Sequence, residues 1–406
     1  MRTPQRSRAT ALGFVLGLAA LTLTACGTSA ATGESVEGKN VASGAPVKVG
    51  YINQEQAATG SFPELRESTE SAFQYVSKDL GGAGGHPIEL IKCTVDGSPE
   101  SAQKCANEMV QKKVVAVVSG INFSGPSSYE VVTAAGIPYI TAAPIQGTDF
   151  NGKNTFALLG SSPAQFTGEA KFLLGKGVKK VSLIVNDTPS GQAGADILIE
   201  QLKAGGVTDV TQVKESPTAT DFTGAVSQAA RNDPDAIAVL FVAPACGQIV
   251  QNAKSLGVKA TMVLTTGCSS PSVLGAMGSA AEGVHFVQEL LPTASHKDDP
   301  QVKAYIEAME RFGGIKEKDL TALHANGFAV AMEVADVIGR SGDTPTAASV
   351  TKTLKDPAGG KGFMDSPWVC DGSVLKDYPS VCNASTRVTT VKDGQQVEVT
   401  SSWLGS

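Results

Sequence analysis

This 406-residue chain contains seven cysteines. Cysteine side chains take part in several kinds of chemistry: they ligate metals, act as nucleophiles, form disulfides or carry lipid. A metal site is not expected, because no Cys-x-x-Cys pair occurs and the histidines are scattered. The motifs of hydrolases, P-loop NTPases and zinc proteases are missing from the sequence. The glycine cluster 81–85 precedes a strand-like run, which is the wrong order for a dinucleotide site. We therefore expect no enzymatic activity and no cofactor.

The first cysteine, Cys26, follows a segment that is typical of export. Three arginines within the first eight residues precede an apolar run over residues 11–23, which is too short to span a bilayer. The sequence LTAC at 23–26 resembles a bacterial lipobox, in which the peptide is cut before the cysteine and the thiol carries lipid. The alternative is an ordinary signal peptide with an unmodified cysteine. We expect a lipoprotein signal peptide over 1–25 and a flexible tether from lipidated Cys26 over 26–45.

The six remaining cysteines are an even number in a chain that is predicted to be exported, which favours disulfides. Six cysteines allow 15 pairings, but here they occur as three pairs of sequence neighbours. Neighbour pairing is the simplest prediction: Cys93–Cys105, Cys246–Cys268 and Cys370–Cys382.

Composition and charge describe a globular chain with enough sequence for two lobes. Hydrophobic residues make up 42% and charged residues 18%. When the three arginines of the predicted signal peptide are left out, acidic side chains outnumber basic ones by about nine. No basic patch with interleaved aromatic residues occurs either, so no nucleic-acid partner is expected. No second apolar run could cross a membrane, which leaves the lipid as the expected anchor.

Strand-like and helix-like segments alternate along the chain. Several strand-like runs, such as VVAVV at 114–118, are apolar on both faces, as in a sheet that helices cover on both sides. The alternation predicts parallel sheets with right-handed crossovers. Two stretches share one plan, which favours two similar α/β lobes. The predicted strands are 47–52, 88–93, 114–119 and 137–141 in one lobe, and 181–186, 207–213, 236–242 and 261–266 in the other.

From residue 47 onward the chain resembles the type I periplasmic binding proteins, specifically the branched-chain-amino-acid-type substrate-binding proteins of ABC importers. The segments that carry the resemblance are VKVGYI, GGAGGHPIELI, KKVVAVVSG, AAGIPYITAAP and KKVSLIVND, in that order. The resemblance implies two doubly wound parallel-sheet lobes, joined by a three-strand hinge, with the ligand cleft between them. It places one lobe over 46–158 and 288–385, and the other over 159–287 and 386–406.

Ligands of open parallel sheets bind outside the carboxyl ends of the strands. The loop INFSGPS (121–127) offers a hydroxyl and a helix N-terminus there, and the family holds a ligand carboxylate with a serine in this loop. We predict that Ser124 has this role; the alternative is that Ser124 only caps the helix. The other predicted ligand residues, each of which could instead be a solvated loop or cap residue, are Ser61, Phe62, Phe123, Ala143, Ser190, Ala243, Thr266 and His324.

Three positions depart from the family pattern. The acid that pairs with a ligand ammonium would fall at Thr266, a hydroxyl beside the carboxylate would fall at Ile145, and a tyrosine would fall at Val242. Burying an unpaired ammonium is costly, so an amide or a small carboxylate with an apolar body fits as well as an amino acid.

The function that the resemblance implies is solute capture by lobe closure and delivery to an ABC transporter permease. Sensing is the alternative, in which the same protein docks on a signalling receptor, since the fold serves both. We expect a monomer that is extracytoplasmic and bound to the membrane through its lipid alone.

Overall fold

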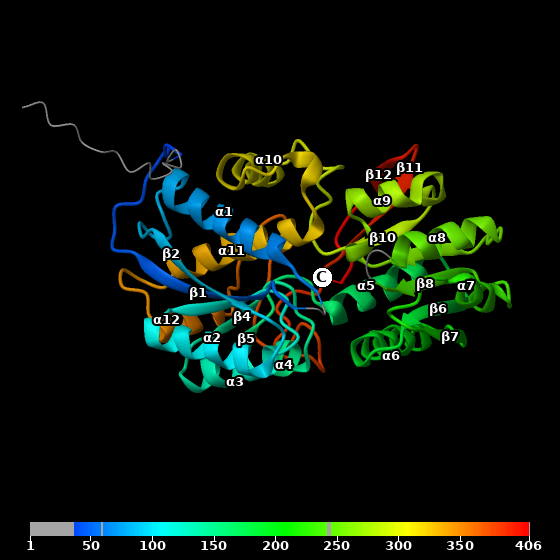
Figure 1. Ribbon diagram of the computed structural model, residues 1–406, viewed down its shortest axis with the longest axis horizontal. Coiled ribbons are helices and arrows are strands. Elements are labelled where there is room, and N and C mark those ends of the chain that lie inside the picture. The colour runs from blue at the N-terminus through cyan, green and yellow to red at the C-terminus, as the bar shows by residue number, and fades with distance from the viewer. Residues whose placement is uncertain (1–35, 58–59, 242–244, 406) are drawn as a thin grey trace, which may run out of the picture. The chain divides into compact units, whose positions relative to one another are not determined.

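The computed structural model describes residues 36–57, 60–241 and 245–405, and Glu37–Ser406 form one compact unit. Within this unit, two β-sheets are each covered by helices on both faces (Figure 1). We call the first sheet with its helices the first lobe, and the second sheet with its helices the second lobe. The predicted α/β fold with two parallel-sheet lobes is confirmed.

The first sheet has the strand order β2-β1-β3-β4-β5, and all its pairings are parallel. Its strands are β1 (Val47–Gln54), β2 (Ile88–Val95), β3 (Ala116–Ser119), β4 (Tyr139–Thr141) and β5 (Thr155–Phe156). The helices between them are α1 (Pro63–Asp79), α2 (Pro99–Lys112), α3 (Gly125–Ala134) and α4 (Gly147–Asn151). Three later helices return to the core of this lobe: α10 (Pro300–Ala308), α11 (Ala322–Gly339) and α12 (Ala347–Leu354).

The second sheet has the order β12-β11-β10-β9-β8-β6-β7. Its strands are β6 (Lys180–Asn186), β7 (Asp209–Glu215), β8 (Ala236–Leu240), β9 (Thr261–Leu264), β10 (His285–Gln288), β11 (Arg387–Lys392) and β12 (Gln395–Glu398). Its helices are α5 (Ser162–Gly175), α6 (Pro189–Ala204), α7 (Thr223–Ala230), α8 (Ala245–Ser255) and α9 (Pro271–Met277). The sheet is not purely parallel, because β11 pairs antiparallel with both β10 and β12.

Local sequence explains where the elements begin. Every residue of β3 and β8 is buried, as their apolar runs require in a sheet covered on both faces. The hydroxyl of Ser98 accepts the N–H of Ser101 and caps α2, and Pro99 occupies the first helical position, where no N–H is needed. The predicted strand over 261–266 ends at Leu264, because Thr266–Cys268 forms a 3₁₀ turn.

Three disulfides join the described cysteines: Cys93–Cys105, Cys246–Cys268 and Cys370–Cys382. Each links sequence neighbours, as the clustering predicted. Cys105 lies on α2 beside β2, and Cys246 on α8 is linked to the 3₁₀ turn after β9. Cys26 lies outside the described residues.

Candidate functional site

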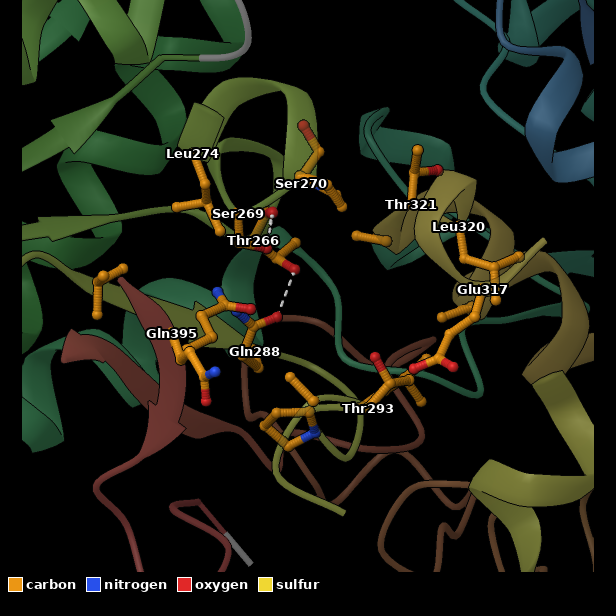
Figure 2. A pocket seen from close by; sticks show the side chains of 18 of the residues that line it. Thr266, Ser269, Ser270, Leu274, Gln288, Thr293, Glu317, Leu320, Thr321 and Gln395 are labelled. Carbon is orange, nitrogen blue, oxygen red and sulfur yellow. Dashed lines mark hydrogen bonds between the residues drawn. The ribbon is translucent and has the colours of Figure 1, made fainter. Parts of the chain in front are cut away.

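A pocket of about 670 Å³ opens between the two lobes (Figure 2). The wall from the second lobe comes from the segment after β9, from Thr266 to Ala281, from the end of β10 and from the β11–β12 hairpin. The opposite wall comes from the segment 290–297, from α10 and from the start of α11. Pockets of this size between domains are typical sites for small molecules.

Thr266 is the predicted ligand residue that lines this pocket. It begins the 3₁₀ turn after β9, and its hydroxyl donates to Gln288 Oε1 at 3.0 Å (Figure 2). Gln288 ends β10, also lines the pocket, and donates from Nε2 to Thr389 Oγ1 at 3.3 Å. Thr266 therefore lies in a polar chain that runs across three neighbouring strands.

The next residue along the chain, Glu289, is buried beside the pocket wall. Its Oε2 accepts a hydrogen bond from Asn326 Nδ2 at 3.2 Å, and Asn326 lines the pocket from α11. Burial raises the pKa of Glu289 to about 7, although the bond from Asn326 acts in the opposite direction. A Cβ on Gly160 would lie 3.1 Å from Glu289 Cγ, so glycine at 160 lets the segment after β5 pass close to this carboxyl.

His324 is not among the residues that line the pocket. It belongs to a reciprocal cap at the start of α11: His324 Nδ1 accepts the Thr321 N–H at 3.1 Å, and Thr321 Oγ1 accepts the His324 N–H at 3.4 Å. Its Nε2 is 3.8 Å from Glu67 Oε2, which is beyond hydrogen-bond distance. Burial lowers the pKa of His324, so the ring is neutral at neutral pH. The geometry gives His324 a capping role in α11.

Two charged side chains line the pocket among the described residues, Lys297 and Glu317. They pair with each other at 2.8 Å, and their side chains are 62% and 51% exposed. The described residues contain no group of three or more His, Cys, Asp or Glu side chains placed to hold a metal ion.

Four other predicted residues gather at the carboxyl ends of β1 and β3. The rings of Phe62 and Phe123 meet edge to face with centroids 6.2 Å apart, and Phe123 is 45% exposed. Ser61 donates its hydroxyl to the Glu55 carbonyl at 2.7 Å. Ser124 donates to the Gly97 carbonyl at 2.5 Å and makes no side-chain cap to α3.

Ala143 follows β4 and packs against the first-lobe core. Ser190, predicted as a ligand residue, lies in the first turn of α6, because Thr188 caps this helix by accepting the Gly191 N–H. The Ser190 hydroxyl is 3.1 Å from that of Thr188. Ala243 lies outside the described residues. The ligand role of all these residues stays a prediction.

Sequence reasoning missed Ser269, Gln288, Thr321 and Asn326, all of which line the pocket. Gln288 stands at the carboxyl end of a strand, which would have marked it, but β10 was not among the predicted strands. Asn326 lies within helix α11, and its sequence context does not show whether the side chain faces a pocket or the core.

We expect Ser124→Ala to lower the free energy of unfolding by about 1 kcal/mol, because the Gly97 carbonyl loses its donor. The hydroxyl donates to Gly97 in this structure, so holding a ligand carboxylate as predicted requires Ser124 to give up this bond. Urea denaturation measures the first effect and titration calorimetry measures affinity. A tenfold loss of affinity would support the predicted ligand role, whereas unchanged affinity would contradict it.

Periplasmic binding proteins are similar to this chain in sequence. The sequence profile described as "Periplasmic binding protein" matches residues 46–367. The Leu/Ile/Val-binding protein BraC3 of Rhizobium johnstonii is 25% identical over 299 residues, which cover 72% of this chain and 78% of that protein.

Two solved structures share the fold with a TM-score of 0.72. One is a branched-chain amino acid ABC transporter protein from Thermus thermophilus with bound valine, 18% identical over 87% of this chain and 95% of that one. The other is a fatty acid ABC transporter substrate-binding protein from Thermomonospora curvata, 16% identical over 91% and 95% of the two chains. At these identities the likeness concerns the fold alone. Since the family profile spans most of the sequence, from the first strand to beyond the last helix, the chain belongs to the periplasmic binding protein family.

Proposed function

We propose that this protein captures a small polar solute between its two lobes, closes around it and delivers it to the permease of an ABC importer. The observation that carries the proposal is the pocket whose walls come from both lobes. A solute that contacts both walls stabilises any arrangement that brings the walls together, which is the basis of hinge closure in binding proteins. Membership of the periplasmic binding protein family supports the same conclusion.

A thermal-shift screen of the purified protein against amino acids, amides, polyols and small carboxylates tests the binding function. A solute at 100 times its Kd adds about 2.7 kcal/mol to the free energy of unfolding. Solution scattering then tests closure, since the bound protein should have the smaller radius of gyration. A screen without any stabilising solute would contradict the proposed function, and an unchanged scattering profile at saturation would contradict closure alone.

The proposed location is outside the cytoplasm, with Cys26 lipidated and the body held to the membrane by that lipid. The leader and the LTAC run support this proposal. None of the helices in the described part of the chain combines the length and apolarity of a membrane span.

We expect Cys26→Ala to release the protein from membranes into the soluble fraction, because the thiol is the proposed site of the anchor. Fractionation with a high-salt wash measures this release, and the thermal midpoint should not change. Ser29→Ala, a small change three residues further along, is the control. A Cys26→Ala protein that stays in the membrane pellet after the wash would contradict lipidation.

A further inference from the structure

The segment that leads into β1 is hydrogen-bonded to the first lobe, and we call its residues 37–44 the strap. The Asn40 N–H donates to the Lys78 carbonyl in the last turn of α1 at 2.9 Å. The Asn40 carbonyl accepts the N–H of Gly81, just beyond the end of α1, at 2.8 Å. The strap therefore pairs with the C-terminal end of α1 through its own backbone.

An arginine from a third element clamps the start of the strap. Arg311, in the π-helical turn Met309–Gly313 after α10, donates to the Asp79 carboxylate and to the Glu37 carbonyl. The same carboxylate accepts the Lys39 N–H at 3.0 Å through Oδ1. Because the Asp79 side chain is only 3% exposed, this charged contact is less screened by water than a surface ion pair.

Two glycines of the strap lie too close to the lobe for a side chain. A Cβ on Gly38 would lie 2.5 Å from the Lys78 carbonyl oxygen, and a Cβ on Gly44 would lie 2.7 Å from the Gly85 carbonyl oxygen. Both obstacles are backbone atoms, so only glycine permits this approach. The close approach lets the Gly44 N–H donate to the Gly85 carbonyl at 2.9 Å. The strap is thus a fitted part of the first lobe.

We propose that the strap makes the first lobe the membrane-held lobe, with the C-terminal end of α1 nearest to the lipid surface and the second lobe free to move against it. The inference rests on the proposed anchor at Cys26. Only the ten residues 27–36 lie between Cys26 and the strap, and even a fully extended chain of this length spans no more than about 40 Å. A chain that was free as far as residue 45 would span about 70 Å. The docked strap therefore keeps one end of the first lobe close to the membrane and sets no such limit on the second lobe.

Trypsin cleavage after Lys39 in the full chain tests the docking, because a protease cuts a hydrogen-bonded segment only when it opens. We expect this cleavage to be at least about tenfold slower in the wild type than in a synthetic peptide of residues 34–45. Arg311→Met removes the clamp and should speed the cleavage about ten- to hundredfold. Arg340→Met is the matched control, since Arg340 pairs with Asp336 at the end of α11, and it should leave the rate unchanged.

Two outcomes of this digestion, followed by mass spectrometry, would overturn the docking. One is a wild-type protein that is cut after Lys39 as fast as the free peptide. The other is Arg311→Met protein that is cut no faster than Arg340→Met protein.

Energy transfer to labelled lipid tests which lobe the membrane holds. The chain from Cys26 onward is coupled through the Cys26 thiol to a maleimide lipid in phosphatidylcholine vesicles, since the other six cysteines are paired in disulfides. A fluorescent amino acid replaces either Leu80, beside the strap at the end of α1, or Leu256, which follows α8 of the second lobe (Figure 1). The two side chains are similarly exposed, at 46% and 47%.

We expect stronger transfer to acceptor-labelled headgroups from position 80 than from position 256. Equal transfer from the two positions, or stronger transfer from position 256, would overturn the inference. The lipid is attached chemically, so neither result depends on natural lipidation, which the fractionation of Cys26→Ala tests. Neither depends on solute binding, which the thermal-shift screen tests.

Discussion

Glu169→Gln is expected to make the protein more stable than the wild type at pH 9, with little difference at pH 5. Glu169 lies on α5 with 1% of its surface exposed, and neither carboxylate oxygen has a hydrogen-bond partner within the described chain. Burial raises the pKa of Glu169 to about 8, from 4.5 for an unperturbed glutamate. The folded protein therefore keeps a proton that the unfolded chain has already released.

The sign of the effect follows from this difference in bound protons. Below pH 4.5 both states are protonated and the native state suffers no penalty from this group. Between pH 4.5 and about 8 the unfolded chain ionises first, so the free energy of unfolding of the wild type falls as the pH rises. The glutamine side chain does not ionise, so the variant lacks this dependence of stability on pH. The stability difference between variant and wild type should grow by on the order of 3–4 kcal/mol between pH 5 and pH 9.

Urea denaturation at pH 5, 7 and 9 measures this difference. The control is Glu130→Gln, which makes the same change at an exposed position on α3. The effect assigned to Glu169 is the part of the pH-dependent difference that Glu130→Gln does not reproduce. A Glu169→Gln difference that does not vary with pH would mean that Glu169 ionises normally in the folded protein.

Gly327→Ala is expected to lower the free energy of unfolding by on the order of 2 kcal/mol, because it overpacks the contact between α1 and α11. A Cβ at this position would lie 2.6 Å from the Leu65 carbonyl oxygen and would also collide with the Ser68 side chain. The obstacle is partly backbone, which cannot move aside without separating the two helices. Both helices contribute to the core of the first lobe.

Gly224→Ala is the matched control for this prediction. Gly224 is also helical, in α7, but nothing lies within 4 Å of the position that its Cβ would take. There the usual preference of helices for alanine should raise stability by about 0.5–1 kcal/mol. Urea denaturation of the two variants should thus give shifts of opposite sign. A stabilising Gly327→Ala would show that α1 and α11 do not pack this closely.

The sequence alone was sufficient to predict features that depend on residues close together along the chain. Buried strands such as β3 and β8 are apolar on both faces, so their runs are visible without any partner. The cap of α2 depends on Ser98 and Pro99, which are adjacent. Disulfide pairing could be predicted because 12 or 22 residues separate the two cysteines of each pair.

Features that depend on contacts between segments far apart in the sequence, or on strands of polar sequence, could not be predicted from the sequence. The β11–β12 hairpin consists of short strands with mostly polar sequence, and only its pairing with β10 places it in the second sheet. The first residue of α6 depends on the cap at Thr188, and Ser190 two residues later is an equally plausible cap by residue type.

The sequence determined the fold class, the places of most strands along the chain and the three disulfides, because each follows from residues close together along the chain. Only the tertiary structure decided which polar groups form the pocket, since Thr266, Gln288 and Asn326 come from three separate elements. It also decided which of these polar groups are bonded to each other. Whether a hydroxyl donates to the protein or to a solute depends on which acceptor lies within 3 Å of it, and for Thr266 that acceptor is Gln288, 22 residues away.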